Sequence, residues 1–200
     1  MVKFDLSDFE RAADRVGAAK DQVAYALSQS LNDGLFRARD FAISSTWPRG
    51  VSVRDTNFLR NALRVERSDK RNLIGAVTSL GTRAGDRAHL AMHESGGIKR
   101  PAKSRIAVPS QAIKARRGAR GIPRNLRPAN VPNSFRRGDV IYQVTGRKKN
   151  RKLKLLYTLK TGVPIKPTVH WHTDFDMMMR REVANAFPGR FKAAMASKRR

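Results

Sequence analysis

The sequence predicts an α+β fold: long N- and C-terminal helices packed on a small antiparallel sheet, with an extended basic arm rich in proline, glycine and arginine. Apolar residues recur at steps of three and four near both ends of the chain, and apolar and polar residues alternate in central segments. Residues 98–137 lack sustained periodicity. We therefore expect residues 1–97 to hold the first helix, a hairpin and a short helix. Residues 98–137 are expected to form an extended arm or loop, and residues 138–200 to complete the same domain with a second hairpin and the last helix.

The first helix has a clear start signal. Ser7 and Glu10 have the spacing of a capping box, in which the first side chain caps the helix and the second reaches back. Apolar residues follow on one stripe as far as Ala42, which predicts a long amphipathic helix that ends by Trp47-Pro48. The run Asn32-Asp33-Gly34 predicts a bend or an interruption in it.

A first hairpin is expected directly after a short helix. Residues 55–63 read as this helix, capped by Asp55 or Thr56. Residues 63–67 and 73–80 favour β structure on either side of the polar turn 68–71. A further short helix is expected over residues 86–94, closed by Gly96-Gly97.

A second hairpin is expected around the turn 146–150. Residues 140–144 alternate between apolar and more polar side chains, and the return strand carries Leu153, Leu155, Tyr157 and Leu159 at alternate positions. Side chains at alternate positions of a strand share one face, so these four are expected together. We expect both hairpins to form one sheet against the long helix.

The last helix is predicted to start at Thr173, with Asp176 as the second member of a capping box. Pro188 is expected to kink or divide this helix. Its apolar side is expected to consist of Phe175, Met179, Val183, Ala186, Phe187, Phe191 and Met195.

The net charge dominates the composition. Forty-two Lys and Arg against sixteen Asp and Glu give +26, and such a charge repels itself unless an anionic partner or neighbouring subunits neutralise it. The absence of cysteine excludes disulfides, thiolate zinc sites and a cysteine nucleophile. No apolar run approaches the roughly eighteen residues of a membrane helix, and the first residues lack a signal-peptide pattern. We expect a soluble intracellular product that works within a complex and has no membrane partner.

The basic residues gather in one tract. From Lys99 to Lys160 there are nineteen Lys or Arg against the single acid Asp139. Two interpretations stay open: backbone-level contact with DNA, or docking on acidic surfaces of partner proteins. The scarcity of aromatic residues argues against sequence-specific recognition. The residues expected to face DNA or a partner are Arg116, Arg117, Arg120, Arg124, Arg127, Arg147, Lys148, Lys149 and Arg151.

Two pairs of histidines have spacings that could present two ligands to a metal ion. His89 and His93 stand four apart on a predicted helix, but Leu90 occupies the position where metalloproteases have a glutamate. His170 and His172, followed by two aspartates, resemble metal-dependent nucleases in residue type only, because such sites need several acidic ligands. We expect no catalytic residue, no metal site and no cofactor, and so no enzyme.

The order of elements resembles phage tail-component families. In these families an Asp-Thr-Gly-x-Leu-Arg motif opens the first strand, and Asp55, Thr56, Leu59 and Arg60 match it, with Asn57 in place of the glycine. Residues 91–97 are similar to the helix end with a glutamate and a following glycine in these families. The size, the basicity and the closing pattern resemble the minor tail protein Z family of lambdoid phages.

The resemblance implies a structural virion protein of the tail or neck that acts in tail completion or head-tail joining. It implies a homo-oligomeric ring around the DNA channel, contacts with the tail tube, terminator or connector, and residence in the host cytoplasm during assembly. A non-specific nucleic-acid-binding protein of another class is the alternative, and a metal-dependent nuclease built on His170 and His172 is a third hypothesis.

Overall fold

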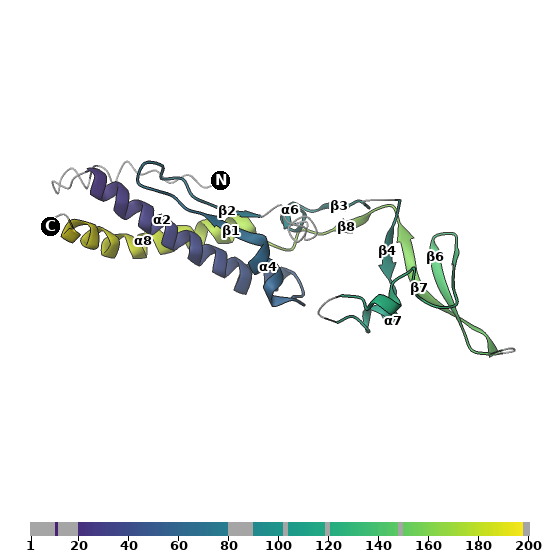
Figure 1. Cartoon of the computed structure of the whole chain (residues 1–200). Helices are drawn as coiled ribbons and strands as arrows, with labels where there is room; N and C mark the ends of the chain where they lie inside the picture. The colour runs from purple at the N-terminus through teal and green to yellow at the C-terminus, as the bar shows by residue number, and fades with distance from the viewer. Residues whose placement is uncertain are drawn as a thin grey trace. The chain divides into compact units, whose positions relative to one another are not determined.

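A computed structural model gives the structure of the chain (Figure 1). It describes residue 11 and residues 20–79, 90–101, 104–118, 121–147 and 150–197. The expectation of mixed helix and small antiparallel sheets is confirmed. The described residues form two compact units: unit 1 lies within Met1–Ser52, Asn57–Leu90 and Thr168–Arg200, and unit 2 within Val53–Thr56 and Ala91–Pro167. The second hairpin and the last helix, expected in the same domain, thus belong to different units.

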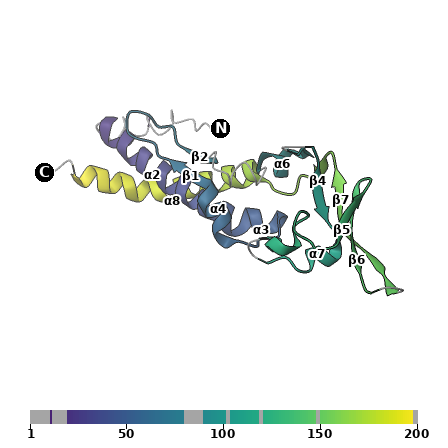
Figure 2. The ribbon, with the colours of Figure 1, turned by 45° about the vertical axis from the view of Figure 1, so that its right-hand side comes forward.

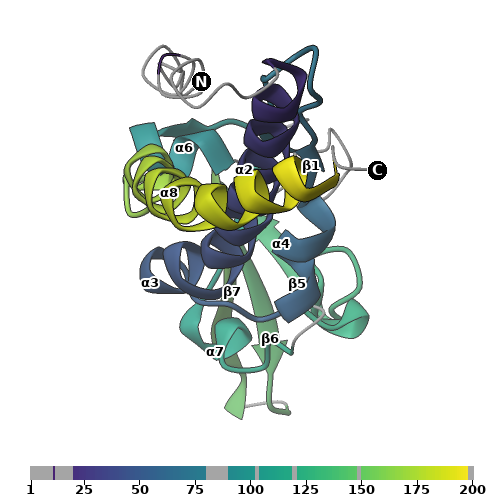
Figure 3. The same cartoon turned by 90° about the vertical axis from the view of Figure 1, so that its left-hand side faces the viewer.

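The core of unit 1 lies between helix α2 (Lys20–Phe41) and helix α8 (Trp171–Ser197), which run side by side (Figures 1 and 3). The predicted apolar stripe of α2 is buried from Val23 to Ala38. It packs on Met178, Met179 and Val183 of α8, and further along on Phe187, Phe191 and Met195. The capping box at Ser7 and Glu10 lies outside the described residues.

A second row of small residues, Ala26, Ser30, Gly34 and Ala38, runs along α2 at steps of four. All four are buried, and Ser30 donates its hydroxyl to the Ala26 carbonyl at 2.8 Å, so that no polar group is left unsatisfied there. A Cβ at Gly34 would lie 3.0 Å from Cγ2 of Val183. Small side chains let the two helix axes approach closely at this point.

The predicted interruption at Asn32-Asp33-Gly34 is wrong, because α2 is continuous there. Each residue has a tertiary contact that explains its presence. Asn32 exchanges hydrogen bonds with the backbone of Ser68 at 3.0 and 2.9 Å, and Asp33 pairs with Arg190 at 2.7 Å. Gly34 contacts α8. Tertiary packing therefore outweighs the local tendency of these residues to break a helix.

The helical path that begins with α2 ends later than predicted, although its α geometry is interrupted after Phe41. A π-helical turn, Ala42–Thr46, follows α2, and helix α3 (Trp47–Gly50) follows that turn. The predicted end at Trp47-Pro48 is thus a few residues early. Pro48 lies in the first turn of α3, directly after the π-helical turn.

The first hairpin and the helix before it are confirmed. Helix α4 (Thr56–Ala62) leads into β1 (Leu63–Glu66), which pairs antiparallel with β2 (Ala76–Ser79). Leu59 and Ala62 of α4 are buried with Trp47 and Val169.

Helix α8 differs from its prediction at the expected capping box and at Pro188. It begins at Trp171, so Thr173 lies within its first turn, and Asp176 pairs with Arg180 at 2.8 Å instead of serving a cap. It continues as one helix through Pro188, so the predicted division is wrong. Apolar contacts with α2 on both sides of the proline hold the two halves together.

Unit 2 is built on a four-stranded antiparallel sheet in the order β4-β7-β6-β5, whose strands are drawn together in Figure 2. The bounds are β4 Ile106–Pro109, β5 Ser134–Arg137, β6 Val140–Thr145 and β7 Lys152–Lys160. The predicted second hairpin, β6 with β7, is confirmed. The single sheet expected to contain both hairpins is wrong, because β4 and β5 occupy the two sides of this hairpin and β1 pairs only with β2.

A smaller sheet pairs β3 (Gly97–Lys99) with β8 (Val163–Ile165). It follows helix α6 (Leu90–Ser95), which ends where Gly96 adopts φ 75°, a value that favours glycine. The predicted helix end is thereby confirmed, while residues 86–89 lie outside the described residues.

The expected basic arm is folded in the structure. Besides β3, β4 and β5, residues 98–137 contain helix α7 (Gln111–Lys114) and the 3₁₀ helix η2 (Arg124–Leu126). Ile113 and Val131 from this stretch are buried with Leu156 and Tyr157 of β7. The apolar residues are few, but β7 gives them a common core, and periodicity within one segment cannot reveal such a core.

A β-bulge corrects the predicted face of β7. Ile141 pairs with Tyr157, but the next residue, Tyr142, pairs with Leu155, so Leu156 is one extra residue on β7. The strand changes face there: Leu156 and Tyr157 are each 1% exposed, whereas Leu153 is 62% and Leu155 43% exposed. The expectation that Leu153, Leu155, Tyr157 and Leu159 share one face is wrong.

Candidate basic interface on unit 2

One group of predicted basic residues lies on the segment that covers the buried face of the sheet. Arg116 and Arg117 directly follow α7, and Arg124 and Arg127 lie at η2. All four side chains are exposed, while Ile113, Ile122 and Leu126 from the same segment pack into the core.

Hydrogen bonds to its backbone hold this segment in place. The amides of Arg116 and Arg127 donate to the carbonyls of Ile113 and Arg124, both at 3.2 Å. The Tyr157 hydroxyl donates to the Leu126 carbonyl at 2.5 Å. The cations in this segment are therefore carried by an ordered scaffold, which lowers the entropy lost when an anion binds.

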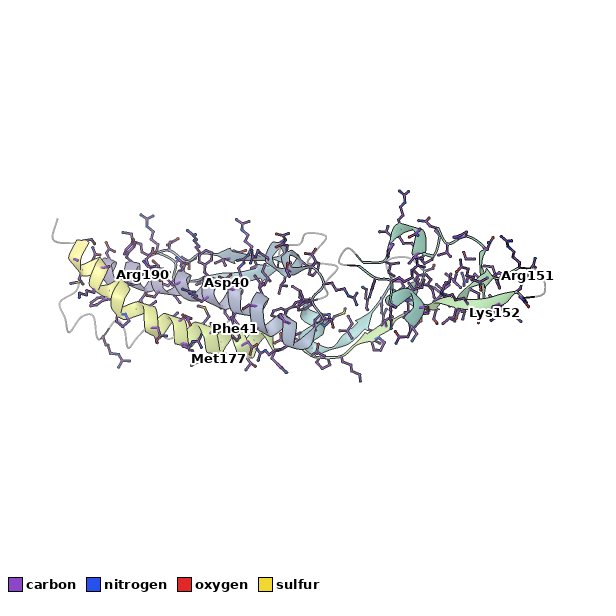
Figure 4. All side chains as sticks on the ribbon, turned by 90° about the horizontal axis from the view of Figure 1, so that it is seen from below. Asp40, Phe41, Arg151, Lys152, Met177 and Arg190 are labelled. Carbon is purple, nitrogen blue, oxygen red and sulfur yellow. The ribbon has the colours of Figure 1, made fainter. Side chains whose placement is uncertain are left out.

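The second group of predicted residues lies at the end of the β6–β7 hairpin. Arg147 and Arg151 flank the turn, and the Asn150 amide donates to the Arg147 carbonyl at 3.0 Å. Figure 4 labels Arg151 and Lys152 at this end of the hairpin. In the register, β4 and β5 pair only with parts of the hairpin away from this end, which leaves it as a two-stranded projection.

The structure thus places the predicted residues in two groups, Arg116 to Arg127 on the covering segment and Arg147 with Arg151 at the hairpin end. Arg120, Lys148 and Lys149 lie outside the described residues. Sequence reasoning missed Lys152 and Lys154, which are exposed on β7 beside the same end. Their signal was the strict alternation Lys-Leu-Lys-Leu over residues 152–155.

These cations have little internal neutralisation. Asp139, the one acid between Lys99 and Lys160, is bound by Arg105 and lies 3.9 Å from Arg136. Within the described ranges, no ion pair joins a carboxylate to Arg116, Arg117, Arg124, Arg127, Arg147 or Arg151. An anion supplied from outside is the partner that this surface can accept.

The electrostatic influence of Arg117 is visible at Tyr157. Burial raises the pKa of the Tyr157 hydroxyl, and the nearby positive charge of Arg117 partly opposes this rise.

The histidine pairs do not assemble into a metal site in the part of the chain that the structure describes, where no three potential ligands of the His, Cys, Asp or Glu type come together. His170 and His172 are exposed at the start of α8. Of the aspartates beside them, Asp174 accepts from Thr46 and Arg49, and Asp176 binds Arg180. His89 lies outside the described residues.

No helix among the described residues has both the length and the apolar character needed to cross a membrane. Comparisons with protein-family models, with curated proteins and with solved structures find no match to the chain.

Proposed function

We propose that the protein is a non-enzymatic structural component of a phage tail or neck that acts in tail completion or head-tail joining. The observation that supports this most is the basic surface of unit 2, whose cations stand on an ordered scaffold without carboxylate partners among the described residues. A surface of this kind suits a protein that works only inside an assembly, where neighbouring acidic surfaces or DNA phosphates neutralise it.

The motif that resembles phage tail-component families has a structural role consistent with this proposal. Thr56 begins α4, Leu59 is buried beneath it, and the helix leads directly into β1. The match at Asp55, Thr56, Leu59 and Arg60 therefore lies at the start of α4 and within it, ahead of β1, whereas in the families the motif opens the first strand.

In a ring around the DNA channel, a basic surface would contact phosphates without reading bases. Such contacts are weak individually and independent of sequence, which lets DNA move past. On acidic partner proteins, the same surface would instead help fix the ring to the tail tube, terminator or connector.

Particle composition tests the proposal. Virions of the phage or induced prophage that encodes the chain would be purified by density gradient and examined by quantitative mass spectrometry. The protein should be present in several copies per particle, and deletion of its gene should leave particles with incomplete tails or unjoined heads. Absence from mature particles, together with normal particles after deletion, would rule the proposal out.

A non-specific nucleic-acid-binding protein of another class is the second candidate, favoured by the same unpaired cations. It predicts tight binding of free duplex DNA at physiological salt, with a steep linear dependence of log affinity on log salt. Fluorescence anisotropy with duplexes of unrelated sequence would measure this. Tight binding by a chain that is absent from particles would favour this second candidate.

A further inference from the structure

One face of the four-stranded sheet carries solvent-exposed apolar side chains. Phe135, Tyr142 and Leu155 form one cross-strand row, and Val144 and Leu153 form the next. Leu153 and Leu155 are among the most exposed large apolar residues described, and Phe135 is exposed as well. We refer to these five residues as the open face.

The bulge at Leu156 explains why this face exists. It directs Leu156 and Tyr157 into the core beneath α7 and η2, and it leaves Leu153 and Leu155 on the other side of the sheet. Exposed apolar groups gathered in one patch and rimmed by polar residues are typical of interaction surfaces.

The residues around the open face are all of one charge. They are exposed and form no ion pair with a carboxylate in the described parts of the chain. Arg137 lies two residues beyond Phe135 on β5, Arg151 lies two residues before Leu153, and Arg147 lies at the hairpin end.

We propose that the open face docks onto another protein whose surface has an apolar centre surrounded by aspartate and glutamate side chains. The apolar rows would supply the burial, and the basic rim would select the partner by charge. The inference goes beyond the proposed function, because it rests on unit 2 alone and holds for any assembly in which the chain takes part.

Two other occupants fit less well. A second copy of the same face would bring the cations Arg137, Arg147 and Arg151 against the same three cations. Single-stranded nucleic acid needs aromatic ring faces on which bases stack. Here the side chains that protrude most are leucines, and the rings of Phe135 and Tyr142 already stack on each other with centroids 5.9 Å apart.

A synthetic amphipathic helical peptide with a leucine stripe bordered by glutamates is a suitable probe. Its binding to the full-length protein would be measured by fluorescence anisotropy at physiological ionic strength. One control peptide has lysine in place of glutamate, and the other has serine in place of leucine. Only the first peptide should bind, because the open face needs both the apolar stripe and the negative border.

Variants locate the binding on the protein. Leu153→Ser with Leu155→Ser should weaken binding by at least about ten-fold, and Arg137→Glu with Arg151→Glu should do the same. Ile74→Ser removes an equally exposed apolar side chain from unit 1 and should have no effect. Because all four open-face and rim positions are exposed, the variants should keep the circular dichroism of the wild type. The charge pair still tests the proposal if the leucine pair fails to fold.

Equal binding of the serine peptide would overturn the proposal in favour of charge alone, and equal binding of the lysine peptide would overturn the role of the rim. Binding of oligo-dT that is lost in a Phe135→Ala variant would favour nucleic acid instead. Self-association of the wild type that disappears in the leucine variant would identify a second copy as the occupant. None of these outcomes depends on whether the protein occurs in phage particles, so the two proposals can fail separately.

Discussion

The hydroxyl of Thr46 donates a hydrogen bond of 2.6 Å to the carboxylate of Asp174, which joins the π-helical turn after α2 to the first turn of α8. Arg49 binds the same carboxylate oxygen, and the rings of Trp47 and Trp171 stack beside this contact with centroids 5.6 Å apart. Asp174 therefore has a structural role at the junction of the two long helices.

Replacement of Asp174 tests this role. Asp174→Ala leaves the buried Thr46 hydroxyl without its acceptor, so we expect a loss of about 1–3 kcal/mol in the free energy of unfolding. Asp174→Asn keeps an acceptor and should lose less. Asp176→Ala, which breaks only the surface pair with Arg180, is the matched control and should cost under about 0.5 kcal/mol. Urea unfolding measures all three, and equal losses at both positions would contradict the assignment.

The bulge in β7 predicts opposite outcomes for two adjacent leucines. Leu156→Ala empties a buried site and should cost about 2–5 kcal/mol of unfolding free energy. Leu155→Ala removes a side chain from the open face and should change stability by no more than about 0.5 kcal/mol. Chemical denaturation of both variants is the measurement. A larger loss at Leu155 would mean that the register is shifted by one residue.

The pKa of Tyr157 reports on Arg117. Because burial raises this pKa and the arginine opposes the rise, Arg117→Glu should raise the Tyr157 pKa further, whereas Arg116→Glu should change it less. A raised folded-state pKa contributes stability that is present below the unfolded pKa and is lost as pH rises through the folded value. The variant should thus lose stability more steeply under alkaline conditions. NMR titration of ring-labelled tyrosine, assigned with Tyr157→Phe, would measure the pKa, and no change in Arg117→Glu would refute the contact.

Charge reversal at Arg116, Arg117 and Arg120 tests whether the basic surface has a function. The exposed positions Arg116 and Arg117 lie outside the core, so α2 and α8 should remain folded while the yield of infectious particles falls. Reversal of three exposed cations in unit 1, Arg37, Arg64 and Lys192, is the matched control.

The type of failure distinguishes the two roles of the charge. Particles that package DNA but fail in delivery would indicate a role in the channel, and heads that do not join tails would indicate docking. Wild-type assembly and infectivity would end the claim that these residues matter.

The sequence predicts elements whose periodicity is local. The stripe of α2, the hairpin at residues 63–80 and the hairpin at residues 140–160 are confirmed for this reason. Features set by distant contacts were not predictable. Asn32 hydrogen-bonds to Ser68, Ile113 is buried against β7, and Leu156 is the extra residue of a bulge in the pairing of β7 with β6. Each of these features depends on contacts with another segment of the chain.

The sequence predicted most of the basic residues that form the candidate site. It did not predict how these residues are arranged in space. Clustered arginines indicated an anion-binding surface, but their separation into a covering segment and a hairpin end follows from the sheet. The exposure of the open face could not be predicted, because regular alternation of leucines in a strand normally indicates a buried stripe. A single extra residue in β7 reverses that interpretation for Leu153 and Leu155.

The interleaving of the two units along the chain also affects how the protein is made. Helix α2 is synthesised before α8, on which its buried row packs. The sheet of unit 2 is encoded between them and has all its strands before α8 is made. Until α8 emerges from the ribosome, the apolar side of α2 lacks its partner helix and is open to aggregation or to chaperones. Loss of the final helix through a premature stop would therefore harm the beginning of the chain more than its middle.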